Sequence, residues 1–155
     1  MKKIAMIILF LYTYSFSFAQ DKGNASTSQL LTAYYNLKDA LVAGNTNAVA
    51  SGAGEFIKKL NAVDKGIIKD EDRNPLFKEG TAISKTNNLS LQRERFAILS
   101  ASMIALAKKV KLTTGPVYQQ YCPMKKSSWL SINKAIKNPY YGSAMLTCGS
   151  VVDTL

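Results

Sequence analysis

The protein is a basic chain of 155 residues with a formal net charge of +10, 47% hydrophobic residues and no histidine. The absence of histidine excludes a Ser-His-Asp triad and a Cys-His pair, both of which need an imidazole base, and it removes the commonest metal ligand. Because no paired carboxylates form a recognisable motif either, we expect that the protein is not an enzyme.

The first 19 residues have the parts of a secretory signal peptide. Lys2 and Lys3 precede an apolar run over 4–18, and Ser17-Phe18-Ala19 places small residues at the positions that a signal peptidase reads. We predict cleavage after Ala19 and a periplasmic or secreted protein without a stable membrane span, because the apolar run is too short to cross a bilayer comfortably. Loss of the two lysines lowers the formal charge to +8. In that compartment, basic charge favours contact with anionic envelope surfaces, and we expect no nucleic-acid partner.

Hydrophobic side chains then recur at three- and four-residue steps, as in amphipathic helices. After a segment over 20–28 that we predict to be disordered, the first helix begins near Gln29 and ends at Gly44-Asn45, which tolerate left-handed backbone geometry. The second helix follows at once, capped at Asn45 or the next residue, and extends to about Val63. The short connection favours antiparallel neighbours.

Two more helices follow a charged, aperiodic stretch over 64–73 that we interpret as a loop. Asn74-Pro75 resembles a helix cap with proline at the first helical position, and it starts a short helix. The strongest hydrophobic pattern predicts a helix from a cap at Ser90 to about Val110.

The C-terminal lobe over 117–149 lacks a sustained helical pattern. We expect a short extended segment over 117–121, one helical turn at Trp129-Leu130, and a short helix that begins at Asn138-Pro139 and ends at Gly149. The predicted fold is therefore all-α: a four-helix up-down bundle with an irregular C-terminal lobe, in a single domain over 29–155.

The lobe contains both cysteines of the chain, each close to a methionine: Cys122 with Met124, and Met145 with Cys148. Residues two apart in an extended segment point the same way, and residues three apart on a helix share a face, so each pair can direct two sulfurs to one point. Thiolate and thioether sulfurs are soft donors suited to Cu(I) or Ag(I). Zinc prefers cysteine with histidine or with further cysteines, and the chain has neither.

A disulfide between Cys122 and Cys148 is the alternative to a metal site. It is the default for a pair of cysteines in an exported protein, and closing the loop would stabilise the fold by roughly 3 kcal/mol. Spacing alone favours the disulfide. The methionines have no part in that interpretation, and they keep the soft-metal interpretation open.

Aromatic and basic side chains accompany the sulfurs. Trp129 and the nearby tyrosines are typical of a small hydrophobic core, and the other interpretation is that they shield a metal from water. The lysines of the lobe form either a solvated face or an electrostatic docking surface for an acidic partner. They stand at positions 125, 126, 134 and 137.

Five runs of residues occur in a characteristic order: QRxxFxxLS at 92–100, VYQQYCPM at 117–124, WLS at 129–131, IKNPYYG at 136–142 and MLTCG at 145–149. Together they resemble a family of small exported bacterial domains of unknown function. Related domains also occur at the C-terminal end of periplasmic adaptor subunits of copper and silver efflux pumps.

The resemblance implies a helical domain that handles heavy metals in the periplasm, and the family pattern is complete at Cys122, Met124, Met145 and Cys148. On the basis of this resemblance, we favour soft-metal binding over a disulfide between the two cysteines. We predict an exported Cu(I)- or Ag(I)-binding protein that sequesters the ion or passes it to a partner, such as a heavy-metal efflux pump or another envelope protein. The rival prediction is a disulfide-stabilised envelope module that binds a protein or has a structural role, without metal.

Overall fold

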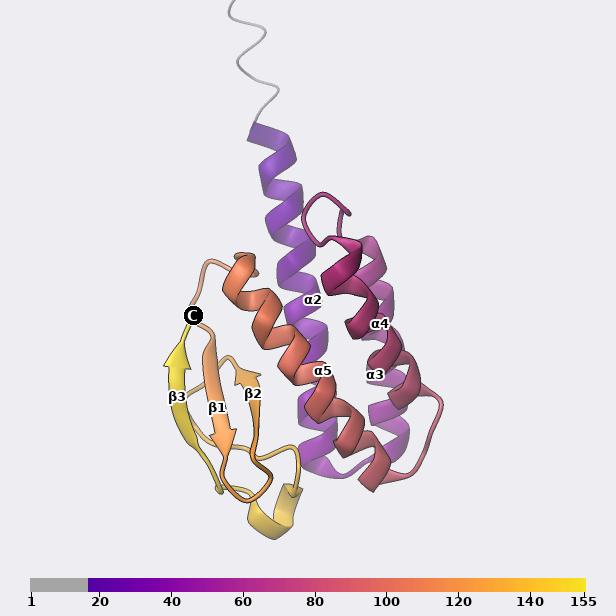
Figure 1. Ribbon diagram of the computed structural model, residues 1–155, viewed down its shortest axis with the longest axis vertical. Coiled ribbons are helices and arrows are strands. Elements are labelled where there is room, and N and C mark those ends of the chain that lie inside the picture. The colour runs from indigo at the N-terminus through magenta and orange to yellow at the C-terminus, as the bar shows by residue number, and fades with distance from the viewer. Residues whose placement is uncertain (1–16) are drawn as a thin grey trace, which may run out of the picture.

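The computed structural model describes residues 17–155, so most of the predicted signal peptide over 1–19 lies outside the described residues. Four helices form a helical core: α2 (Ser17–Ala43), α3 (Thr46–Ala62), α4 (Asp70–Ser84) and α5 (Leu89–Lys109). The lobe that follows contains β1 (Tyr118–Cys122), β2 (Ser127–Ser131), the 3-10 turn η1 (Gly142–Met145) and β3 (Ser150–Thr154). Figure 1 shows the sheet lying beside α5, with η1 below the lower ends of the helices.

The helical core forms because each predicted hydrophobic stripe meets another. Consecutive helices pack against one another, α2 also contacts α5, and α5 contacts β2. Leu37, Phe56 and Phe96 are fully buried, and burial of each such side chain contributes roughly 1.5–3 kcal/mol. In the part of the chain that the structure describes, no helix combines the length and apolarity needed to cross a bilayer.

The segment over 20–28, which we predicted to be disordered, is helical and belongs to α2. The hydroxyls of Ser26 and Thr27 donate to the carbonyl of Gly23 at 2.9 and 3.2 Å. Gly23 lies so close to Ile67 that an added Cβ would be 2.9 Å from its Cδ1. The prediction was wrong because this small, polar segment packs on the α3–α4 connection, a tertiary contact that composition does not reveal.

Helix α4 begins at Asp70, before the predicted start at Asn74-Pro75. Acidic side chains fill its first turn, where negative charge interacts favourably with the helix dipole. Arg73 then donates to the carbonyls of Val63 and Ile68 at 2.8 and 3.0 Å, which fixes the preceding loop. The charged stretch that we interpreted wholly as a loop is therefore partly a helix start.

The prediction of an all-α fold is wrong in the lobe, which contains a three-stranded antiparallel sheet in the order β2-β1-β3. Trp129 and Leu130 lie in β2 instead of a helical turn, and the predicted helix from Asn138 to Gly149 is reduced to η1. Strand β3 is exposed along its whole length. Because both faces of β3 are exposed, its sequence lacks the alternation of apolar and polar residues that would predict a strand.

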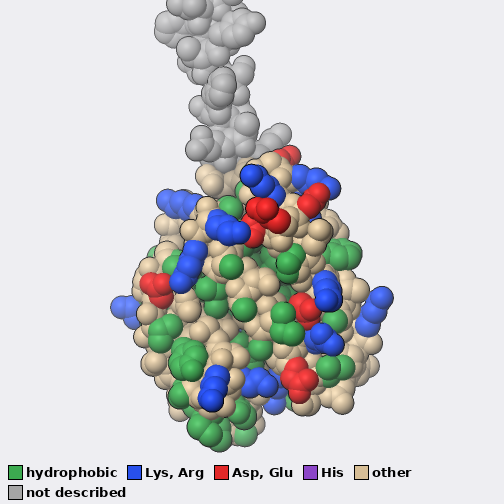
Figure 2. Space-filling model, viewed as in Figure 1, with side chains coloured by type: hydrophobic (Ala, Val, Ile, Leu, Met, Phe, Trp, Pro, Cys, Tyr) green, Lys and Arg blue, Asp and Glu red, His purple; other side chains and the backbone are tan. Residues whose placement is uncertain are grey.

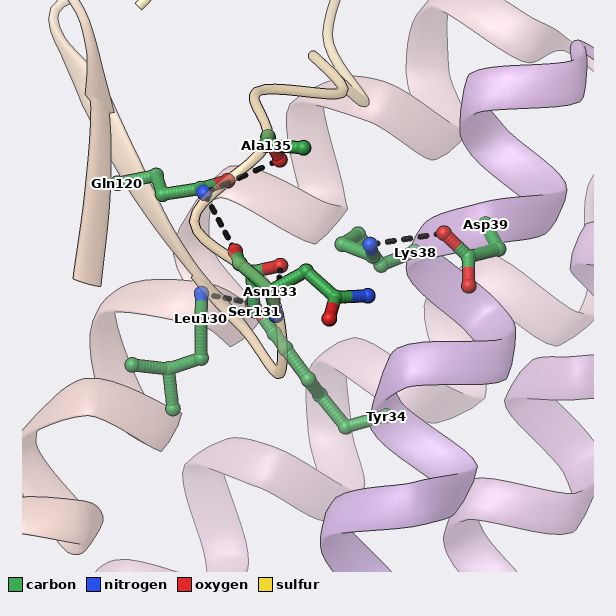
Figure 3. A network of polar contacts seen from close by, with 8 residues as sticks. All are labelled: Tyr34, Lys38, Asp39, Gln120, Leu130, Ser131, Asn133 and Ala135. Atoms are coloured by element: carbon green, nitrogen blue, oxygen red, sulfur yellow. Dashed lines mark hydrogen bonds and ion pairs between the residues drawn. The ribbon is translucent and has the colours of Figure 1, made fainter. Parts of the chain in front are cut away.

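Tyr34 of α2 joins the helices to the sheet. Its buried hydroxyl lies 2.7 Å from the Ser100 Oγ of α5 and accepts a hydrogen bond from the Leu130 N–H of β2 at 3.1 Å. Figure 3 shows the Tyr34 side chain reaching from α2 to β2, and the Gln120 amide of β1 beside the backbone of the loop at 131–135. Gln120 Nε2 donates to three carbonyls of that loop, at 2.9, 3.2 and 3.3 Å. The Tyr34 hydroxyl thus holds the lobe on the helices, and Gln120 holds the loop over 131–135 within the lobe.

Candidate functional site

Cys122 is the last residue of β1 and is fully buried. The four residues after it form the β1–β2 hairpin loop, whose last member, Lys126, has a left-handed φ of 53°. This tight loop turns the backbone N–H of Lys125 toward the Cys122 sulfur, at 3.5 Å. A backbone N–H directed at a sulfur stabilises the thiolate form, which is the form that binds metals.

Cys148 follows η1 on a loop that Asn138 holds in place by a hydrogen bond. The Cys148 N–H donates to the Met145 carbonyl at 3.1 Å. Asn138 is fully buried, donates from Nδ2 to the Cys148 carbonyl at 2.8 Å, and accepts from the Tyr140 N–H at 2.8 Å. We predicted from the sequence only that a short helix begins at Asn138-Pro139. The Asn-Pro dipeptide, typical of a turn in which the asparagine side chain bonds to the backbone two residues on, was the signal for the role that the structure shows.

Gly149 allows the Cys148 loop to approach the sheet. Its φ is +146°, and a Cβ at this position would lie 2.8 Å from the Tyr121 carbonyl oxygen and 3.0 Å from the Trp129 ring. A side chain would therefore push the loop away from β1. Gly149 had been predicted to end a helix, but in the structure it brings Cys148 beside the end of β1.

The two cysteine sulfurs lie 3.6 Å apart and are not bonded to each other. Burial favours a raised pKa for Cys122, but hydrogen bonds outweigh it and lower that pKa; they come from the Lys125 N–H, the Asn138 side chain, Cys148 and the Met124 N–H. The hydrogen bond to Cys122, assisted by burial, raises the pKa of Cys148. In the reduced pair, Cys122 is thus the first thiol to ionise and Cys148 keeps its proton to donate to it.

The two methionines predicted as ligands lie on the two loops that carry the cysteines. Met124 is in the hairpin loop and is 62% exposed, and Met145 is at the end of η1 and is 41% exposed. Figure 2 shows hydrophobic side chains gathered at the lower end of the molecule, where Figure 1 places the hairpin loop and η1. Cys148 lies outside η1, so it does not share a helix face with Met145 as we predicted. The ligand role of both thioethers stays a prediction.

The aromatic residues of the lobe form a wall between the cysteines and the helices. Trp129 is fully buried, and its ring meets that of Tyr140 edge-to-face at 5.8 Å. Tyr140 in turn packs near Phe96 of α5, with ring centroids 6.1 Å apart, and donates its hydroxyl to the Ser128 carbonyl at 2.6 Å. These contacts match the interpretation of the aromatics as a small core.

Other metal-binding arrangements are not available near the pair. Within residues 17–155, no three or more His, Cys, Asp or Glu side chains come together in a way that could hold a metal ion. A metal at this position would depend on the two thiolates and on donors other than carboxylates. That donor set suits soft monovalent ions better than zinc, calcium or magnesium.

Comparisons with curated proteins and with solved structures returned no match. A comparison with known families matched residues 30–115 to the family described as "Protein of unknown function (DUF3347)". The match contains the QRxxFxxLS run at 92–100 and lies upstream of the sulfur-containing runs at 117–149. It confirms the predicted resemblance to a domain of unknown function. Because the match covers more than half of the chain, the chain belongs to the DUF3347 family.

Proposed function

We propose that this protein is an exported, periplasmic protein that binds one Cu(I) or Ag(I) ion and either sequesters it or passes it to a partner. Cys122 and Cys148 bind the ion as thiolates, and Met124 and Met145 complete the site as thioethers. The observation that carries the proposal is the 3.6 Å separation of the two cysteine sulfurs, which are brought together from segments far apart in the lobe.

The separation is short enough for one metal ion to bridge the two sulfurs with little movement. A disulfide requires a sulfur–sulfur distance of about 2.05 Å, so the sulfurs would have to close by about 1.5 Å. With the zinc–thiolate distance of about 2.3 Å as a yardstick, a metal between two thiolates places the sulfurs roughly 3.8 Å apart in tetrahedral geometry and 4.6 Å apart in linear geometry. The pair needs to open by only about 0.2 Å to reach the lower value.

The proposed metal site has a buried side and an exposed side, and each has its own role. The buried Cys122, its hydrogen-bond donors and the Trp129–Tyr140 wall exclude water behind the ion. The exposed Met124 and Met145 face the side from which an ion arrives or leaves. The helices, which we propose to be arranged as an up-down bundle, act as the scaffold. On the resemblance to domains in efflux-pump adaptors, a heavy-metal efflux pump or another envelope protein is the proposed partner.

Native mass spectrometry of the reduced protein with one equivalent of Cu(I) tests the proposal. We expect one retained ion in the wild type and loss of retention in Cys122→Ser and Cys148→Ser. Met124→Leu and Met145→Leu should each weaken binding roughly tenfold, a loss of about 1.4 kcal/mol. Met103→Leu, a buried change in the core of α5, is the control and should leave binding unchanged. Failure of the wild type to retain copper, or undiminished retention in Cys148→Ser, would refute the proposal.

The second candidate function is an envelope module in which Cys122 and Cys148 form a disulfide and the basic lobe docks a protein partner. It draws on the same proximity of the sulfurs and on the exposure of Lys126, Lys134 and Lys137. A thiol count on unreduced protein taken from the exported compartment separates the two. No free thiol and no response to metal would favour the module, and two free thiols would favour the metal site.

A further inference from the structure

A pocket of about 420 Å³ lies between the start of α5 and the lobe. Its walls come from three segments: the first turns of α5, the hairpin loop, and the tyrosines before η1. The lining residues are Leu89, Ser90, Arg93, Lys125, Tyr140 and Tyr141. Lys125 and Tyr140 also belong to the surroundings of the cysteine pair, but binding in this pocket requires no metal at the cysteines.

The pocket holds two cationic side chains without an acidic partner. Among the ion pairs of the described residues, none includes Arg93 or Lys125. Arg95, two residues from Arg93 on the same helix, does pair with a carboxylate, Glu79, at 3.6 Å. A partly buried cation without a counter-charge is costly, and burial lowers the pKa of Arg93.

The Arg93 guanidinium is held in place but only partly satisfied. One of its Nη atoms donates to the Leu41 carbonyl at 3.2 Å, at the end of α2. Gly142, with φ +56°, leaves the space for this group, since an added Cβ would lie 2.7 Å from Nη2. The Nε atom is buried and has no hydrogen-bond partner. A buried donor without an acceptor is unfavourable, so the protein itself satisfies the Arg93 guanidinium only in part.

The rest of the lining adds donors and an apolar wall. The side chain of Asn88, and not Ser90 as we predicted, caps α5 by accepting from the Leu91 N–H at 3.0 Å. The N–H groups of Leu89 and Ser90, at the first two positions of the helix, have no acceptor within the helix. Tyr140, which is 4% exposed, and the half-buried Tyr141 also line the pocket. The volume exceeds what a bare inorganic anion fills, so the chemistry fits an anionic group carried on a small apolar body.

We propose that this pocket binds a small organic oxyanion of the phosphate or carboxylate class. Arg93 and Lys125 contact the anionic group, and the tyrosines pack against its organic body. The shared chemistry is an oxygen anion that accepts several hydrogen bonds from cationic and backbone donors.

Titrations of the reduced protein, followed by amide NMR shifts at constant ionic strength, test the proposal with two probes of the same body, phenyl phosphate and benzoate. We expect saturable shifts centred on residues 89–93 and 125, and the tighter probe identifies the anion class. Arg93→Gln and Lys125→Gln should each weaken binding at least about tenfold, as expected for loss of a charge-assisted hydrogen bond. Arg93→Lys keeps the positive charge and is the second variant to measure in case Arg93→Gln does not fold.

Lys126→Gln is the matched control, because it removes the same charge from the neighbouring residue, which is exposed and does not line the pocket. It should bind both probes as the wild type does. Saturable binding that depends on Lys125 and not on Lys126 supports the proposal. The absence of saturable shifts with both probes, or equal weakening by Lys125→Gln and Lys126→Gln, would overturn it.

Discussion

Asn138→Ala is expected to destabilise the fold and to release Cys148 from Cys122. The substitution removes the donor to the Cys148 carbonyl and the acceptor for the Tyr140 N–H, both at 2.8 Å. A buried polar group left without a partner costs about 1–3 kcal/mol. The Tyr140 N–H is buried, whereas Cys148 is only partly buried, so water can reach its carbonyl. We therefore expect a loss of about 2–4 kcal/mol in the free energy of unfolding.

Urea unfolding of the reduced protein measures this loss, with Asn133→Ala as the control. Asn133 is also an asparagine of the lobe, but it is exposed, and substitution there should change stability by no more than about 0.5 kcal/mol. The Asn138 side chain also helps to lower the pKa of Cys122, so its removal should raise that pKa. Stability of Asn138→Ala within about 0.5 kcal/mol of the wild type would show that the buried amide does not hold the loop.

Three further predictions concern the lobe and its support. Gly149→Ala should lower stability by about 1–3 kcal/mol in thermal or urea unfolding, because its positive φ and the Tyr121 carbonyl exclude a side chain; Gly54→Ala, where an added Cβ meets nothing, is the control and should not destabilise. Ultraviolet titration of thiolate absorbance in the reduced protein should show two steps, one below and one above an ordinary cysteine, since the pKa is lowered for Cys122 and raised for Cys148; a single step at the ordinary value would contradict the pairing. Burial raises the pKa of the Tyr34 hydroxyl above its unfolded value, so this group's contribution to stability should be fully present below about pH 10 and be lost as the pH rises further; unfolding curves that do not weaken above pH 10 would contradict it.

The helical part of the fold could be predicted because its information is local. The stripe that contains Leu37 and the stripe that contains Phe96 repeat at helical spacing, and Gly44 stands where α2 ends, with φ +71°. The errors there were at the boundaries. The start of α2 depends on contact with Ile67, and the start of α4 depends on charges that favour a first helical turn as readily as a loop.

Only part of the sheet could be predicted. The extended segment that we expected over 117–121 coincides with β1, whereas β2 and β3 pair with it across the lobe and have sequences that do not alternate. In β2, Trp129 and Leu130 are both buried. Trp129 packs against Tyr140 of the lobe, and the Leu130 N–H donates to the Tyr34 hydroxyl. In β3, Val151 and Val152 are both exposed. A strand buried or exposed on both faces has no period of two, so only the pairing with β1 defines it.

The sequence by itself determined which sulfur donors this chain has. It has two cysteines, each near a methionine, and no histidine to offer another base or ligand. Only the tertiary structure decided which sulfurs meet. The hairpin loop, the buried Asn138 and the tight approach at Gly149 bring Cys122 and Cys148 to 3.6 Å, while both methionines stay largely exposed. Composition specifies which donors exist, but the distance between donors depends on backbone turns and buried hydrogen bonds that form only when the lobe folds against the helices.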